Sequence, residues 1–255
     1  MPRRDWTRDE LIVAFSLYCR IPFGRIHIRN PEITALASAL GRSPSSVSWK
    51  LANFARLDPA LRKRRIRGAT HGAKAEEEIW NEFSNNWDSL TYESQELLAK
   101  FMHVPPVELL AKEDFPEGKT RDAIVKARVN QSFFRSAVLA AYDCRCCITG
   151  VAVLELLTAS HIVPWSIDTK NRTNPRNGLC LNAIHDRAFD SGLVTVTPDY
   201  RIVVSGTLKR SLKAEDSLSG TLLLDYEGLR IKLPERFVPD QEFLRYHNEQ
   251  RFKRD

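Results

Sequence analysis

The segment from Cys144 to Gly192 constrains the fold of this chain more than any other. It reads CRCCITGVAVLELLTASHIVPWS, then a polar loop, IDTKNRTNPRNGLCL, then NAIHDRAFDSG. The first part predicts two short strands joined by a Thr-Gly turn, and the second of these strands ends at His161. The last part predicts a helix that contains His185 and ends at Gly192. The order strand, strand, loop, helix therefore places one histidine at a strand end and one on a helix.

Four blocks of this segment occur in a fixed order within about 50 residues, which is far more specific than any single block. They are Cys147-Ile148-Thr149-Gly150, Ser160-His161-Ile162-Val163-Pro164-Trp165, Asn177-Gly178-Leu179-Cys180-Leu181 and His185-Asp186-Arg187-Ala188-Phe189-Asp190-Ser191-Gly192. Together they resemble the HNH endonuclease family, in the branch with the A-H-I-x-P-W, N-G-L and H-D-x-x-F-D patterns. The tail LPERFVPDQEFLRYHNEQRF is similar to the closing strand and helix of that family.

This resemblance implies an α+β chain whose C-terminal part is a ββα-metal domain that hydrolyses DNA phosphodiester bonds. His161 takes the position of the general base, since a neutral imidazole accepts a proton from water near pH 7. His185 takes the position of a metal ligand, for a divalent ion of which Mg²⁺ or Mn²⁺ is expected. Asn177 takes the position of a residue that holds the base in place. Arg176 and Arg187 are expected near the phosphate by position alone.

The residue before the base departs from the pattern of many HNH enzymes, which place Asp or His there as a second metal ligand. This chain has Ser160, and a hydroxyl is a poor ligand. Asp186 and Asp190 are candidates for the missing ligand, and Asp190 is alternatively a brace for the turn at Gly192.

Five cysteines raise the question of a structural zinc site. Cys144 and Cys147 have the spacing of half a zinc knuckle, but a second C-x-x-C pair is missing and Cys180 is the only cysteine downstream. Buried thiols are therefore favoured over a structural zinc site.

The N-terminal part predicts a helix-turn-helix or winged-helix-like DNA-binding domain over residues 1–70. A helix over residues 7–20 begins with a capping box, Thr7 and Glu10. A second helix runs from Pro31 to Gly41, and a third starts at once, with Ser43 as N-cap. Two short helices around a glycine turn describe a helix-turn-helix, whose second helix enters the major groove.

Candidate DNA contacts follow from this assignment. They lie in the turn, at the start of the third helix and in the basic run after it: Arg42, Ser45, Ser46, Ser48, Trp49, Lys50, Arg62, Lys63, Arg64 and Arg65. A helical bundle whose basic face binds nothing is the alternative.

Charge is unevenly distributed along the chain. Residues 1–74 carry 15 Lys and Arg against 5 Asp and Glu, a net +10, whereas residues 75–118 carry 2 against 11, a net −9. We expect residues 71–119 to be a helical acidic connector, with one helix over AEEEIWNEFSNNWDSL, and residues 120–255 to be the nuclease domain.

The expected partner is double-stranded DNA. We expect no membrane contact and a cytoplasmic protein, because the sequence lacks a long apolar run and a signal peptide. Cutting both strands implies either a homodimer or sequential nicking, and the sequence leaves both open. Restriction of foreign and base-modified DNA is the biology that the family suggests. The alternatives are a non-catalytic DNA-binding regulator on a degenerate HNH scaffold, and an RNA-acting or homing nuclease.

Overall fold

The computed structural model describes residues 4–64, 74–105, 121–212 and 217–254. Its helices are α1 (Arg8–Arg20), α2 (Pro31–Ala39), α3 (Pro44–Ala55), α4 (Pro59–Lys63), α5 (Lys74–Phe83), α6 (Trp87–Met102), α7 (Arg121–Ala141), α8 (Ala183–Asp190), α9 (Gly206–Ser211), α10 (Ser217–Leu223) and α11 (Gln241–Gln250). Short 3₁₀ turns are η1 (Phe23–Arg25), η3 (Leu154–Leu156), η4 (Pro175–Asn177) and η5 (Leu224–Tyr226). The strands are β1 (Leu157–His161), β2 (Gly178–Asn182), β3 (Val194–Val196) and β4 (Ile202–Val204). This mixture of helices and two small sheets confirms the α+β class.

The three predicted N-terminal helices begin where their capping residues stand. Thr7 and Glu10 form the capping box of α1, Asn30 caps α2 and Ser43 caps α3, with proline at the first position of α2 and of α3. Each cap satisfies main-chain N–H groups that a helix start leaves unpaired, so these starts are encoded locally. Residues 4–64 and 74–105 contain no strand, so the described N-terminal part has no wing.

Helix α1 is the centre of the N-terminal half. Its residues from Glu10 to Cys19 are all buried, and it contacts α3, α5, α6 and α7. Phe15 and Tyr18 pack against Phe54 of α3 and Trp80 of α5, with ring centroids 4.9 to 6.3 Å apart. Because these rings come from three helices, the cluster ties the helices into one body.

The acidic segment packs against this helical body, whereas the sequence predicted that it connects two domains. Its predicted single helix is interrupted at residues 84–86, between α5 and α6. Glu76 is buried and pairs with Lys50 of α3, while Arg8 of α1 pairs with both Glu82 and Glu93. The negative charge of this segment therefore neutralises part of the positive charge of the first 64 residues.

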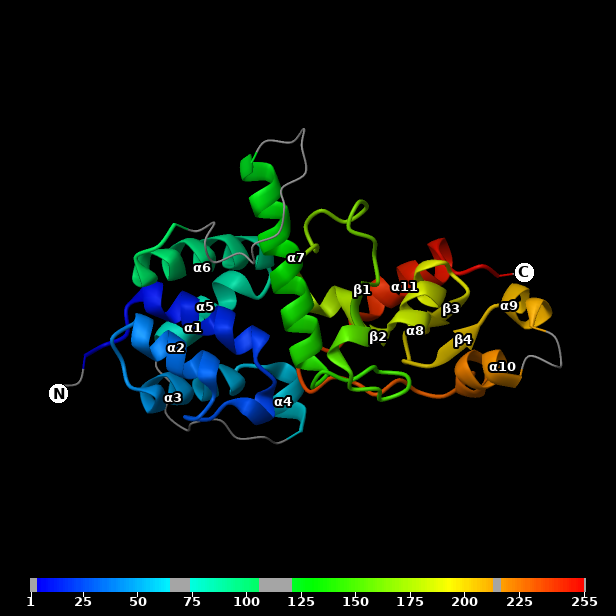
Figure 1. The fold of residues 1–255 in the computed structure, drawn as a ribbon, viewed down its shortest axis with the longest axis horizontal. Helices are drawn as coiled ribbons and strands as arrows, with labels where there is room; N and C mark the ends of the chain where they lie inside the picture. The colour runs from blue at the N-terminus through cyan, green and yellow to red at the C-terminus, as the bar shows by residue number, and fades with distance from the viewer. Residues whose placement is uncertain (1–3, 65–73, 106–120, 213–216, 255) are drawn as a thin grey trace.

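Helix α7 separates the two halves of the molecule, with the N-terminal helices on one side and both sheets on the other (Figure 1). On its N-terminal side it contacts α1 and α6, and on the other it contacts β1, β2 and η4. The predicted domain boundaries at 70/71 and 119/120 both lie outside the described residues and stay predictions.

The strand pair differs from the prediction. Residues 144–150 form turns rather than a first strand, and β1 pairs antiparallel with β2, which follows the polar loop. Cys147 keeps a single main-chain bond to this sheet, from its N–H to the Cys180 carbonyl at 2.8 Å. Residues 162–177 therefore form the loop that connects the two strands of this pair, and the loop begins directly after His161.

Arg236 joins the two halves. It is fully buried, its guanidinium donates to the carbonyl groups of Tyr18 and Ile21 at the end of α1, and its charge lies 4.5 Å above the Tyr18 ring. A cation at the C-terminal end of a helix is favoured by the helix dipole, and a buried charge needs such partners.

Replacing Arg236 with glutamine is expected to lower the free energy of unfolding by about 3 kcal/mol, because two buried carbonyl groups lose a charged donor. Urea denaturation followed by circular dichroism measures this change. Arg230→Gln is the matched control, since Arg230 is exposed and bonds only to the Asp199 carbonyl; its effect should stay below about 1 kcal/mol. Equal effects of the two substitutions would contradict the role given to Arg236.

His247 anchors the last helix. Its ring stacks on Phe189 with centroids 3.7 Å apart, Nε2 lies 3.2 Å from the Phe189 carbonyl and Nδ1 lies 2.8 Å from the Thr195 hydroxyl. A carbonyl only accepts, so Nε2 carries the proton and Nδ1 accepts from Thr195. Burial lowers the pKa of His247 to about 4.

This lowered pKa predicts a loss of stability in mild acid. Between pH 6.5 and 4 the unfolded chain binds a proton that the folded His247 refuses, so stability is complete above pH 6.5 and falls by about 3 kcal/mol on the way to pH 4. Urea denaturation at pH 7.5 and 5.0 should show a smaller drop for His247→Gln than for the unaltered protein. An identical drop in both proteins would contradict this account.

Among the described residues, none of the helices is both long enough and apolar enough to cross a membrane.

Candidate active site

His161 ends strand β1, and the opposite position on β2 is Gly178. A Cβ atom at Gly178 would lie 2.4 Å from Val138 and 2.9 Å from Phe134, both on α7. The glycine therefore lets α7 approach the sheet closely. As a result the Phe134 ring stacks on the His161 imidazole, with centroids 3.6 Å apart and planes 11° from parallel.

The imidazole of His161 is held in one tautomer. Its Nε2 lies 2.9 Å from the Arg172 carbonyl, which only accepts, so Nε2 carries the proton and Nδ1 carries the free lone pair. Burial lowers the pKa of His161 below its ordinary value, and the Arg172 carbonyl and the charge of Asp190 oppose that shift. The ring is therefore neutral near pH 7, with Nδ1 available to accept a proton.

Asn177 fastens the loop that follows His161. It is fully buried, its Oδ1 accepts from the Val163 N–H at 2.8 Å, and its Nδ2 donates to the Val163 carbonyl at 3.1 Å and the Asn171 carbonyl at 3.3 Å. Its own carbonyl accepts from the Ile162 N–H at 3.0 Å. These are the bonds that a brace for the base requires.

The same loop is attached to the N-terminal half. The Thr173 hydroxyl, which is fully buried, donates to Asp88 of α6, one residue after the carbonyl that holds His161. Arg172 itself lies over the Trp165 ring and donates from Nε to the Trp165 carbonyl at 2.9 Å. The position of the base therefore depends on contacts from outside the strand pair.

Asp186 and Asp190 are the carboxylates that the fold brings to this end of β1. They lie one helical turn apart on α8, so they share a face of that helix. Asp186 accepts a hydrogen bond from Ser160, the neighbour of the base, and the charge of Asp190 acts on both Asp186 and His161. Burial raises the pKa of Asp186, and the like charge of Asp190 adds to that rise.

The structure packs the His185 ring against Tyr226 of η5, and its assignment as the metal ligand stays a prediction. Its Nδ1 lies 3.0 Å from Oδ1 of Asn182, its ring meets the Tyr226 ring edge-on at 5.5 Å, and the residue is 2% exposed. Burial lowers its pKa, and the group that opposes this is the main chain of Leu222. His185 thus packs between α8 and η5, whereas its neighbour Asp186 turns toward Ser160.

The donor set fits a hard divalent cation. Two carboxylates on one helix face gain from a shared cation, and Mg²⁺ is typically bound by one or two carboxylates together with water and phosphate oxygens. Within the described residues no group of three or more His, Cys, Asp or Glu side chains is placed to hold a metal. Asp186 and Asp190 would therefore hold the ion jointly with the substrate, and Ser160 braces the first of them.

A cavity of about 330 Å³ lies beside His161, lined also by Phe134, Arg135 and Trp165. Asp186 and Asp190 do not line it. A phosphate must reach both the imidazole and the two carboxylates, so it would bind at the open surface between β1 and α8 rather than in this cavity.

Two predicted DNA contacts are used inside the protein, which corrects their assignment. The Arg42 guanidinium pairs with the buried Glu10 at 2.8 Å, lies 4.2 Å above the Trp6 ring and is 7% exposed. Lys50 pairs with the buried Glu76 and is 13% exposed. Both cations complete ion pairs that a buried carboxylate needs, so we remove them from the candidate DNA contacts.

The other predicted contacts lie nearer the surface. Trp49 is 65% exposed and Ser45 is exposed, while Ser46 and Ser48 are half-buried at the start of α3. Arg62, Lys63 and Arg64 are exposed on and after α4, and Arg64 makes a 3.2 Å ion pair with Glu235. Arg187 is exposed on α8, Arg176 pairs with Asp240 at 3.0 Å, and Arg65 lies outside the described residues.

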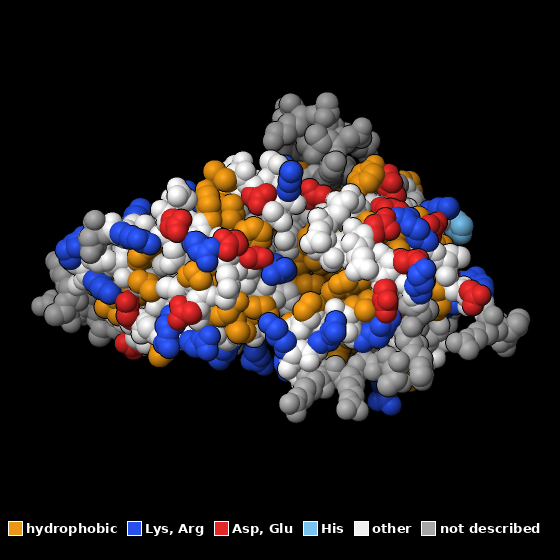
Figure 2. Space-filling view, turned by 180° about the vertical axis from the view of Figure 1, so that it is seen from behind, with side chains coloured by type: hydrophobic (Ala, Val, Ile, Leu, Met, Phe, Trp, Pro, Cys, Tyr) orange, Lys and Arg blue, Asp and Glu red, His pale blue; other side chains and the backbone are white. Residues whose placement is uncertain are grey.

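Figure 2 shows Lys and Arg side chains gathered along the lower edge of one face, with acidic side chains mainly above them. Phosphate backbones are attracted to such an edge.

The cysteines, all within the described residues, form no disulfide: Cys19, Cys146, Cys147 and Cys180 are buried and Cys144 is half-buried. The preference for thiols over a structural zinc site stays a prediction. Burial raises the pKa of Cys180 to about 12.

Sequence reasoning named Asp186 and Asp190 only as alternatives. The signal that favours them is their spacing of four residues, which a helix turns into one face. His185 stands one residue earlier and cannot share that face.

Residues 146–197 match the family model described as HNH endonuclease. This range contains His161, Asn177, Asp186 and Asp190. A comparison with curated proteins found none that matches the chain.

Proposed function

Starting from the HNH endonuclease domain that residues 146–197 make up, we propose that this protein is a metal-dependent DNA endonuclease with His161 as its general base. The observation that carries the proposal is the imidazole of His161, held by the Arg172 carbonyl with its free Nδ1 at the strand end that Asp186 and Asp190 share.

In the proposed reaction, Nδ1 of His161 accepts a proton from a water molecule while the water oxygen attacks phosphorus. The bond from phosphorus to the 3′ oxygen then breaks, the departing oxygen takes a proton from solvent, and the imidazolium of His161 returns its own proton to solvent. A bound divalent cation supplies charge neutralisation at the phosphate and at the departing oxygen. Phe134 fixes the plane of the imidazole, and Asn177 fixes the loop that carries the Arg172 carbonyl.

DNA binding by α3 and α4 is part of the proposal. Trp49, Ser45, Ser46 and Ser48 would face the major groove, and Arg62, Lys63 and Arg64 would contact phosphates. The exposure of Trp49 and of the three cations supports this. A homodimer or sequential nicking by single molecules would each produce a double-strand break.

Nicking of supercoiled plasmid in Mg²⁺, Mn²⁺ or Ni²⁺ tests the activity. We expect nicked and then linear DNA, and no cleavage in excess EDTA. Full activity in EDTA would contradict the metal, and intact plasmid with every ion would favour the non-catalytic regulator.

A restriction role on foreign and base-modified DNA is the finer proposal, and it rests on the family alone. Unmodified, methylated and hydroxymethylated plasmids, cut side by side, test it. Preference for a modified plasmid is expected, and equal cleavage of all three would remove the modified-base part.

A further inference from the structure

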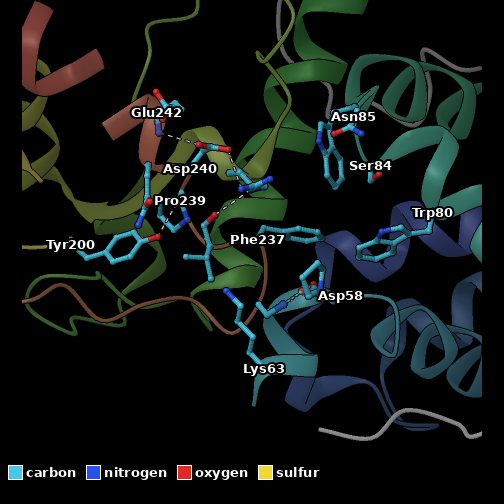
Figure 3. A pocket seen from close by; sticks show the side chains of 16 residues that line it. Asp58, Lys63, Trp80, Ser84, Asn85, Tyr200, Phe237, Pro239, Asp240 and Glu242 are labelled. Carbon is cyan, nitrogen blue, oxygen red and sulfur yellow. Dashed lines mark hydrogen bonds and ion pairs between the residues drawn. The ribbon is translucent and has the colours of Figure 1, made fainter. Parts of the chain in front are cut away.

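A cavity of about 530 Å³ lies at the junction of the two halves, outside the candidate active site. Its walls come from α4, from the junction of α5 and α6, and from residues 237–242 (Figure 3). Ligand sites of this size are common where two parts of a chain meet.

Aromatic rings form much of the wall. Trp80 and Trp87 come from the N-terminal half, and Tyr200 and Phe237 come from the C-terminal half. Trp87 and Phe237 meet edge-on with centroids 5.3 Å apart. Rings brought together from both halves suit a flat, aromatic ligand, which gains by stacking on them.

Polar groups also line the cavity. Ser84 is half-buried and Asn85 is exposed, and Figure 3 shows both on the same side as Trp80. Trp87 is 3% exposed, and its Nε1 is a buried donor without a partner. An amide with free donor and acceptor groups can pair with the polar edge of a base.

A cation stands at the rim. Lys63 is exposed on α4, has no ion-pair partner within the described part of the chain, and extends from α4 toward the C-terminal wall in Figure 3. A neighbouring hollow shares Pro59 and Trp80 with the cavity and adds Arg62. These cations suit the phosphate of a nucleotide whose base enters the cavity.

We propose that this cavity binds one nucleobase, stacked against the aromatic part of the wall and held at its polar edge by Asn85, with the attached phosphate against Lys63. The base comes either from DNA, swung out of the duplex, or from a free nucleotide. The nucleobase proposal rests on the proposed function only because DNA, as the proposed substrate, is the nearest source of bases.

Photocrosslinking to 5-iodouracil tests the proposal, because this base joins to aromatic side chains that it touches. The full-length protein is irradiated with a duplex whose thymidines are replaced by 5-iododeoxyuridine, or with free 5-iododeoxyuridine monophosphate, in calcium to slow cleavage. Mass spectrometry then maps the joined residues. We expect crosslinks at Trp80, Trp87, Tyr200 or Phe237.

The two arms separate the sources. Crosslinks in the cavity with duplex identify a base of DNA, and crosslinks with the monophosphate alone identify a free nucleotide. Asn85→Ala and Lys63→Gln should each reduce the cavity crosslink at least fivefold, whereas Lys74→Gln, an exposed lysine on α5, should leave it unchanged. Crosslinks that map only outside the cavity in both arms would overturn the proposal.

Plasmid nicking, measured on the same samples, tests the proposed function separately from the nucleobase proposal. Nicking without a cavity crosslink would end the nucleobase proposal and leave the endonuclease intact. A crosslink of the monophosphate in the cavity without nicking would support the nucleobase proposal and contradict the endonuclease.

Discussion

Replacing His161 with alanine is expected to reduce plasmid nicking by a factor of about 10² to 10⁴, the range that a general base contributes. Its imidazole has a free Nδ1 at the end of β1, where the charge of Asp190 acts on it, and alanine leaves the attacking water without a proton acceptor. DNA affinity should change little, because the substitution removes no positive charge near pH 7. Single-turnover nicking measures the first effect and fluorescence anisotropy the second.

His103→Asn is the matched control, since His103 is exposed at the end of α6 and asparagine tolerates its left-handed backbone. Its nicking rate should equal that of the unaltered protein. Unchanged cutting by His161→Ala, with the fold verified by circular dichroism, would remove the mechanism proposed above.

Replacing Asp186 or Asp190 with asparagine is expected to weaken Mn²⁺ binding and nicking at least about 100-fold, because each change removes one anionic ligand from a site that has two. Titration calorimetry with Mn²⁺ measures the affinity, and the nicking rate at rising Mn²⁺ concentration shows how much activity returns. Partial recovery at high Mn²⁺ is expected.

His185→Gln decides between the two assignments on α8. Its ring packs against Tyr226, so the substitution should lower the melting temperature and leave the Mn²⁺ affinity within about twofold. If His185→Gln abolished Mn²⁺ binding while Asp186→Asn retained it, the ligand would be the histidine, as the sequence alone indicated.

Contacts between the two halves of the molecule reach the loop that holds His161. The loop that holds the base is bonded to Asp88 of α6, and Arg236 fastens the end of α1 to the C-terminal half. DNA bound to α3 and α4 would therefore act on a body that is bonded to the loop after His161 through Asp88 and to the C-terminal half through Arg236.

Features that depend on near neighbours in the chain could be predicted from the sequence. The starts of α1, α2 and α3 were predictable because Thr7, Asn30 and Ser43 satisfy N–H groups two or three residues away. The four sequence blocks also predicted the family and the role of His161, since His161 and Asn177 act through the segment between them.

The partner strand of β1 depends on long-range pairing, because β2 follows the polar loop and forms a full ladder with β1, whereas Cys147 contributes a single main-chain bond to Cys180. The tertiary structure also decided that Arg42 and Lys50 serve Glu10 and Glu76 rather than DNA, since the acidic partners lie 32 and 26 residues away.

The choice between His185 and Asp186 as the metal ligand shows most clearly why packing must be known. Successive residues of a helix point about 100° apart, so adjacent ligand-type side chains face different surroundings. Which of them faces His161 depends on the rotation of α8 about its axis. That rotation is decided by the packing of α8 on β1, β2 and β3, which the sequence of the helix does not contain.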